Sequence, residues 1–79
     1  MKEIKIKLTS IESVKNFVEK TSKYPFDIDV TSGRYVIDAK SIMGLFSLNL
    51  ENVLTVIPHT TDEESLKKLE EDLKEFIVK

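Results

Sequence analysis

Four short stretches of the chain carry the hydrophobic pattern of β-strands. In two of them apolar residues alternate with polar ones, so one face of each strand would be buried. These apolar positions are Ile4, Ile6 and Leu8 in the first stretch and Phe26, Ile28 and Val30 in the second. The other two stretches are residues 34–38 and the β-branched run 53–57. Gly33 can adopt the positive φ of a tight turn, so we predict a hairpin between the second and third strands.

Two long stretches repeat their apolar residues at intervals of three and four, which places them on one face of a helix. The first repeat is Ile11, Val14, Phe17, Val18 and Thr21, and the last is Leu66, Leu69, Leu73, Phe76 and Ile77. We expect a capping box between Thr9 and Glu12 to start the first helix, and overlapping boxes from Thr60 and Thr61 to start the last. Pro25 ends the first helix, because the residue before a proline is pushed out of the α region.

A short middle helix is predicted over residues 41–48, N-capped by Ser41 or Asp38. Its apolar residues include Ile42, Met43, Leu45 and Phe46. These side chains cover too much of the helix circumference to face inward together. Either some apolar surface is exposed, as at many partner-binding sites, or the sheet and the long helices cover both faces.

The order of elements, β-α-β-β-α-β-α, predicts an α+β fold with two layers and a single domain over residues 1–79. The hairpin makes the sheet at least partly antiparallel. Periodicity alone does not give the order of the strands. We predict that the core contains Ile4, Ile6, Val14, Phe17, Ile28, Val56, Leu66, Leu69, Leu73 and Phe76.

Charge and composition exclude several classes of protein. The net charge is -2 and the basic residues are scattered, so we expect no direct binding of nucleic acid. No apolar run approaches the ~20 residues that span a bilayer, so we expect no membrane insertion. Charged residues interrupt the apolar ones at the N-terminus, unlike in a signal peptide, and we expect a cytoplasmic protein. The absence of cysteine excludes disulfides and thiolate chemistry.

Few residues offer chemistry of their own. His59 is the only histidine, and we interpret it as an exposed loop residue. One histidine without cysteine cannot build an ordinary zinc site, so no metal or other cofactor is expected. Asp27 and Asp29 fit a solvated outer strand face. With two glycines there is no glycine-rich phosphate loop, and no catalytic triad is apparent. We therefore predict no catalytic residues and no enzyme activity.

Residues 38–48, Asp-Ala-Lys-Ser-Ile-Met-Gly-Leu-Phe-Ser-Leu, closely resemble the regulatory-serine segment of HPr phosphocarrier proteins. Residues 21–24, Thr-Ser-Lys-Tyr, are similar to the end of the first HPr helix, and the order of elements matches along the chain. The resemblance implies an open-faced β-sandwich of HPr type, in which three helices cover one face of a four-stranded antiparallel sheet of order 1-4-2-3.

The resemblance also implies work in the phosphoenolpyruvate-dependent sugar phosphotransferase system. HPr takes phosphate from enzyme I onto a histidine at the start of its first helix and passes it to sugar permeases. In many Gram-positive bacteria a kinase also phosphorylates the serine, and the product acts with a transcription regulator. Ser41 matches that serine.

The chain departs from the family where the first helix begins. In place of the family's Gly-Ile-His-Ala-Arg-Pro run, Ser10 falls near the histidine position and Glu12 near the arginine. A phosphoserine ester is far more inert than phosphohistidine, and Glu12 would repel the phosphoryl group that an arginine would hold. His59 cannot replace the missing histidine, because antiparallel first and fourth strands place it at the opposite end of the sheet.

These features predict a non-catalytic regulator or adaptor, similar to the catabolite-repression paralogue of HPr and controlled by phosphorylation of Ser41. The expected partner-binding residues are Ile42, Met43, Phe46 and Lys15, and the expected partners are HPr kinase, enzyme I or a transcription regulator. Two alternatives stay open at this point: a divergent phosphocarrier that uses another residue, and an interaction module no longer tied to sugar transport.

Overall fold

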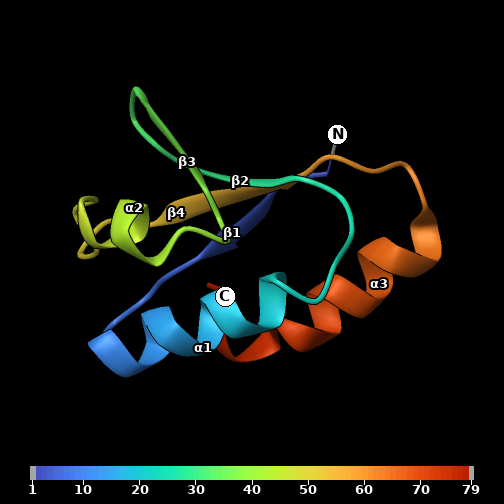
Figure 1. Ribbon diagram of the computed structural model, residues 1–79, viewed down its shortest axis with the longest axis horizontal. Coiled ribbons are helices and arrows are strands. Elements are labelled where there is room, and N and C mark those ends of the chain that lie inside the picture. The colour runs from blue at the N-terminus through green and yellow to red at the C-terminus, as the bar shows by residue number, and fades with distance from the viewer. Residues whose placement is uncertain (1, 79) are drawn as a thin grey trace.

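Four antiparallel strands form one sheet of order β1-β4-β2-β3 in the computed structural model, which describes residues 2–78 (Figure 1). The strands are β1 (Ile4–Ile6), β2 (Ile28–Ser32), β3 (Tyr35–Asp38) and β4 (Leu54–Pro58). Val56 lies opposite Ile4 on one side and opposite Val30 on the other, so β4 is central. The predicted strand order and the hairpin are confirmed, and Gly33 has the expected positive φ of 57°.

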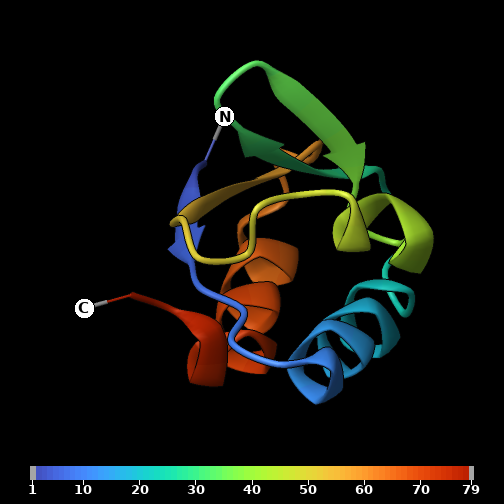
Figure 2. The same cartoon turned by 90° about the vertical axis from the view of Figure 1, so that its left-hand side faces the viewer.

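The helices are α1 (Ile11–Thr21), α2 (Ile42–Phe46) and α3 (Glu63–Asp72), followed by the short 3₁₀ helix η1 (Lys74–Phe76). Figures 1 and 2 show α1 and α3 on the same side of the sheet. The smaller α2 packs against α1 and β3. The helices cover one face of the sheet, which is the predicted open-faced sandwich.

Alternating strand residues meet the apolar stripes of the helices in one core. Phe17 of α1 packs edge to face against Phe76 of η1, with ring centroids 5.7 Å apart. The predicted core residues are buried with one exception. Leu66 is only half-buried, because it lies near the start of α3 and lines a surface groove with Lys2 and Lys67.

Both long helices begin later than predicted. Ser10, not Thr9, is the N-cap of α1, and its capping-box partner is Ser13 rather than Glu12. Ile11 was placed on the inner stripe but is 66% exposed, because it is the first helical residue and lines a surface groove. Asp62, not Thr60 or Thr61, caps α3 by accepting a hydrogen bond from the Ser65 backbone N–H at 3.2 Å. Neighbouring side chains can accept a hydrogen bond from the same first-turn N–H groups, and the one that does so sets where each helix begins.

The last helical stripe does not continue to Ile77 as predicted. Instead Ile77 forms an antiparallel bridge with Ile6 of β1. The Lys7 N–H donates to the Phe76 carbonyl at 2.9 Å, and the Val78 N–H donates to the Lys5 carbonyl at 3.0 Å. The segment after η1 therefore covers the edge of β1 that β4 leaves free.

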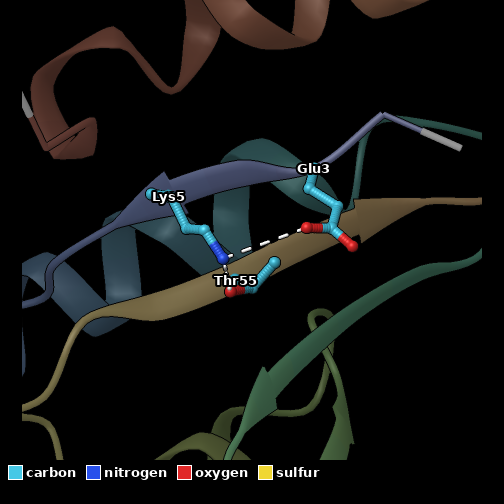
Figure 3. Close-up of polar contacts among 3 residues, drawn as sticks. All are labelled: Glu3, Lys5 and Thr55. Carbon is cyan, nitrogen blue, oxygen red and sulfur yellow. Dashed lines mark hydrogen bonds and ion pairs between the residues drawn. The ribbon is translucent and has the colours of Figure 1, made fainter.

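The face of the sheet opposite the helices is polar along β1 and the neighbouring part of β4. Lys5 Nζ donates to Thr55 Oγ1 at 2.8 Å across the β1–β4 pair and lies 3.9 Å from Glu3 Oε1 (Figure 3). This agrees with the alternation in the first strand, which leaves charged residues on the outer face. Within residues 2–78 no helix is long and apolar enough to cross a membrane.

Candidate functional site

The start of α1 is closed by its own serine residues. The Ser13 N–H donates to Ser10 Oγ at 3.1 Å, and the Ser13 hydroxyl accepts from the Ser10 N–H at 3.0 Å and the Thr9 N–H at 3.1 Å. The same hydroxyl donates to the Ser10 carbonyl at 2.7 Å. Glu12 is exposed in the first turn. Ser10 and Ser13 therefore already use their hydroxyl groups within the helix cap.

His59 lies at the other end of the sheet from Ser10. Ile6, near the end of β1, pairs with Leu54 at the start of β4, whereas His59 follows the last residue of β4. The His59 side chain is exposed, as predicted, but it has a partner that the sequence did not indicate. His59 Nε2 is 2.6 Å from Asp29 Oδ2, and its backbone N–H donates to the Asp27 carbonyl at 2.8 Å.

Asp27 is exposed and Asp29 is partly exposed on the outer face, as predicted, but Asp29 has a side-chain partner that the sequence did not indicate. Only the strand register reveals its contact: Asp29 lies opposite Ile57, and His59 is two residues farther along the same face. Asp27 precedes β2 and is exposed. No cluster of three or more histidine, aspartate or glutamate side chains that could hold a metal ion occurs in the described part of the chain.

Ser41 is the N-cap of α2, and it is one of the two residues predicted for this position. Its hydroxyl accepts a hydrogen bond from the Gly44 N–H at 3.2 Å, and its side chain is half-buried. Asp38, the other candidate cap, instead accepts from the Lys40 N–H at 2.9 Å. The sequence thus identified the residue that starts this helix, although the helix ends at Phe46 rather than Leu48.

The apolar residues of α2 divide between the core and the surface. Leu45 is buried and Ile42 is half-buried, whereas Met43 is 76% exposed and Phe46 is 39% exposed. The alternative in which both faces of this helix are covered is therefore wrong for the isolated chain. Exposed methionine and phenylalanine side chains on one short helix form a surface suited to a protein partner. We call Ile42, Met43 and Phe46 the α2 surface.

Gly44 is needed because α2 lies so close to β3. A Cβ at this position would be 2.6 Å from Ile37 Cγ2 and 3.1 Å from Ser41 Oγ. A β-branched side chain such as isoleucine cannot easily rotate away. The glycine that weakens the helical pattern in the sequence is therefore the residue that lets the helix pack on the sheet.

Two side chains fix the segment that leads into α2, and the sequence pattern gave no sign of either. Lys40 Nζ donates to the backbone carbonyls of Tyr24 at 2.7 Å and Phe26 at 2.9 Å. The buried Thr21 hydroxyl is 3.1 Å from the Ala39 carbonyl. Lys40 therefore ties the segment before α2 to the loop after α1, and Thr21 ties it to the last turn of α1.

Tyr24 joins the same region to α3. Its ring is buried, and its hydroxyl donates to the carboxylate of Asp72 at the end of α3. Burial, followed by this hydrogen bond and the charge of Asp72, raises the pKa of Tyr24 well above its usual range. The phenol stays protonated and serves as a structural donor.

A groove of about 600 Å³ lies between the start of α1 and the loop before β4. Its apolar lining comes from Leu8, Ile11 and Leu50, and Ser10 borders it. The sequence missed this groove because Ile11 was placed on the inner stripe of the first helix. Lys15 is exposed on α1, and no contact in the structure tests its predicted role in partner binding.

The family model for the HPr component of the phosphotransferase system, described as the PTS HPr component phosphorylation site, matches residues 12–77. HPr-C-His from Thermoanaerobacter tengcongensis is 33% identical, with a TM-score of 0.76, and the alignment covers 95% of this chain and 92% of that chain. Crh, the catabolite repression containing protein of Bacillus subtilis, is 27% identical, with a TM-score of 0.65 and coverage of 94% and 88%.

The phosphocarrier protein HPr from Bacillus anthracis has the same fold, with 22% identity, a TM-score of 0.65 and coverage of 90% of this chain and 94% of that chain. No curated protein sequence matches the chain significantly. The predicted family, strand order and open-faced sandwich are confirmed by these likenesses.

Proposed function

Because the chain belongs to the HPr family, we propose that it is a regulator or adaptor that binds other proteins and carries no phosphate on a histidine. HPr proteins are phosphocarriers rather than enzymes, and they act by contacting other proteins of the phosphotransferase system. The observation that carries the proposal is the exposure of Met43 and Phe46 on α2, directly after the capping serine Ser41. These exposed side chains next to the capping hydroxyl support the proposal of a partner surface regulated at Ser41.

Three observations support the loss of phosphate transfer. The match to the family model begins at residue 12, after the position where the resemblance places the phosphate-accepting histidine. Ser10, the residue near that position, shares a closed capping box with Ser13. The only histidine, His59, lies beyond the opposite end of β1 and contacts Asp29. A serine ester would also transfer its phosphate far less readily than phosphohistidine.

Regulation through Ser41 follows from its surroundings. Its only side-chain hydrogen bond in the structure is the one it accepts from the Gly44 N–H. A phosphate at this position would add about two negative charges next to the α2 surface. The modified protein would present a charged helix start beside Met43, where the unmodified protein presents an apolar contact. We propose that this change selects between partners.

The proposed partners are HPr kinase, enzyme I or a transcription regulator, met in the cytoplasm through the α2 surface together with Lys15. The α2 surface supplies the large flexible and aromatic side chains that dominate binding energy at interfaces. Lys15 would add a positive charge from α1. An interaction module without a role in sugar transport would use the same surface but would not need a kinase.

Incubation with HPr kinase and ATP, followed by mass spectrometry of the intact protein and its peptides, tests the proposal. We expect one phosphate, on Ser41, and none on the Ser41→Ala variant. Ser47→Ala is the matched control, because Ser47 is the serine at the other end of the same helix. Phosphate on another residue of the wild-type protein, or no modification at all, would contradict the proposed regulation.

A further inference from the structure

The β2–β3 hairpin and the loop before β4 enclose a groove of about 450 Å³ that no step of the proposed function uses. Figures 1 and 2 show the hairpin tip and this loop at the same end of the molecule as α2. Arg34, in the hairpin turn, is the only arginine of the chain and the only charged residue that lines the groove. The polar lining also includes Ser32, Ser47, Asn49 and Asn52.

The charge of this groove sets it apart from three other surface grooves of the described chain. The groove at the start of α1 contains Lys7 and Glu51, and the groove beside η1 contains Lys7 and Glu75. The groove on α3 contains both lysine and glutamate residues. Only the hairpin groove among these four has a cation that no lining carboxylate balances. Arg34 is exposed and forms no ion pair with another described residue, so its guanidinium is accessible to an acidic ligand.

Two carbonyl groups at this end of α2 accept hydrogen bonds from the segment that follows the helix. The Gly44 carbonyl accepts from the Ser47 hydroxyl at 2.5 Å and from the Ser47 N–H at 3.1 Å, and the Leu45 carbonyl accepts from the Leu48 N–H at 3.1 Å. The side-chain oxygen of Asn49 accepts from the Glu51 N–H at 3.1 Å, which leaves its NH₂ group as the donor. The groove therefore offers donors: the Arg34 guanidinium, amide NH₂ groups and the Ser32 hydroxyl, whereas the Ser47 hydroxyl already donates to Gly44.

Apolar surface borders these donors. Tyr35 lines the groove and is 69% exposed, and Phe46 of the α2 surface directly precedes Ser47. A free inorganic anion would gain nothing from these rings. An acidic side chain on a partner protein, next to an apolar residue, would use both the guanidinium fork and the rings.

We propose that the hairpin groove extends the α2 surface and binds a carboxylate side chain of a partner protein, with Arg34 as its main contact. Arg34 pairs with the carboxylate, the amide groups of Asn49 and Asn52 donate to it, and Tyr35 packs against the residue beside it. This inference rests on the proposed function, because it extends the same partner surface, but it requires no phosphorylation of Ser41.

Nuclear magnetic resonance titration of the full-length protein tests the inference with two blocked dipeptides, N-acetyl-Phe-Glu-amide and N-acetyl-Phe-Gln-amide. We expect the glutamate peptide to shift the Arg34 Nε–H signal and the side-chain NH₂ signals of Asn49 and Asn52. The glutamine peptide should bind at least about tenfold more weakly, because it lacks the charge that strengthens the hydrogen bonds. Arg34→Gln should abolish the preference, whereas Lys23→Gln, an equal loss of charge on an exposed residue outside the groove, should retain it.

Equal shifts with both peptides, or an Arg34→Gln variant that responds like the wild type, would overturn the inference. Acetate and inorganic phosphate are titrated in the same way as free-anion controls. If either shifted the same signals as strongly as the glutamate peptide, the groove would be a site for free anions and the partner contact would be wrong. Binding of the glutamate peptide by a protein that HPr kinase leaves unmodified would support the groove while contradicting regulation at Ser41.

Discussion

The starts of α1 and α2 are built alike but surrounded differently. Each helix begins at a serine whose hydroxyl accepts a backbone N–H from the first turn. At α1 a second serine, Ser13, returns the hydrogen bond and closes the cap. At α2 no second side chain closes the cap of Ser41, and the exposed side chains of Met43 and Phe46 follow.

The comparison shows that a serine at a helix start does not by itself identify a site. The hydroxyl of Ser10 has the same local role as that of Ser41, but only Ser41 lies beside apolar side chains that the fold leaves exposed. The two regions are also supported differently. The Phe17–Phe76 contact anchors α1 in the core, whereas α2 is placed by Lys40, by Thr21 and by the close approach of Gly44 to β3.

The largest expected effect is a difference in stability between two phenylalanine variants, one in the core beside α1 and one on the α2 surface. Phe76 is buried against Phe17, so Phe76→Ala should lower the free energy of unfolding by roughly 3–5 kcal/mol and unfold most of a domain this small. Phe46→Ala should lower the melting temperature less, because Phe46 is 39% exposed whereas Phe76 is 6% exposed. Thermal unfolding followed by circular dichroism measures both; an unchanged melting temperature for Phe76→Ala would mean that the core is misassigned.

Tyr24→Phe should have the next largest effect, because it removes the hydrogen bond that joins the end of α1 to Asp72. Loss of a bond to a charged acceptor costs about 1.5–3 kcal/mol. The raised pKa of Tyr24 determines how its contribution to the free energy of unfolding depends on pH. Below about pH 10 both folded and unfolded chains keep the phenolic proton, and the full contribution is present.

Above about pH 10 the unfolded chain loses the proton that the folded chain still holds, so the contribution of Tyr24 falls as the pH rises. The stability difference between wild type and Tyr24→Phe should therefore be constant below that pH and shrink above it. Urea unfolding of both proteins across this range gives the difference directly. A difference that grew with pH would show that the Tyr24 hydroxyl is not held as a donor to Asp72.

The two helix starts should give the smallest effects on stability, and only the start of α2 should affect partner binding. Ser13→Ala and Ser41→Ala should each cost ~1 kcal/mol, the usual contribution of a cap. Ser41→Asp should keep the fold, because aspartate is also a good N-cap, but it should weaken binding of any partner that contacts the unmodified α2 surface. Calorimetric titration with such a partner measures this. Equal binding by wild type and Ser41→Asp would separate Ser41 from the interface.

The sequence predicted most of the fold because each strand and helix has one apolar face that must be buried. The Ser41 cap was also predictable, since serine before an apolar helical stretch is a local signal. The helix circumference showed that the apolar residues of α2 could not all face inward, but it left open whether the fold exposes them or covers both faces. The exact helix starts did not follow, because Thr9, Ser10 and Ser13 compete for the same N–H groups, and only the path of the backbone decides between them.

The contacts that the sequence could not predict join distant parts of the chain. His59 meets Asp29 through strand register, and Lys40 reaches carbonyl groups some fifteen positions earlier in the chain. In the sequence, Arg34 is one of twelve basic residues, and no local pattern distinguishes it from the others. It became a candidate contact only when the fold showed that no carboxylate lines its groove. Such features depend on tertiary neighbours rather than on local pattern.

Incubation of the wild-type protein with enzyme I and labelled phosphoenolpyruvate tests the central claim, that the start of α1 carries no phosphate and α2 carries the function. A histidine-containing HPr protein serves as the positive control for the enzyme. We predict neither acid-labile label, as on a histidine, nor acid-stable label, as on a serine, because the start of α1 has no histidine and His59 lies at the other end of the sheet. Stoichiometric acid-labile phosphate, on His59 or on any other residue, would contradict the account and make the protein a divergent phosphocarrier.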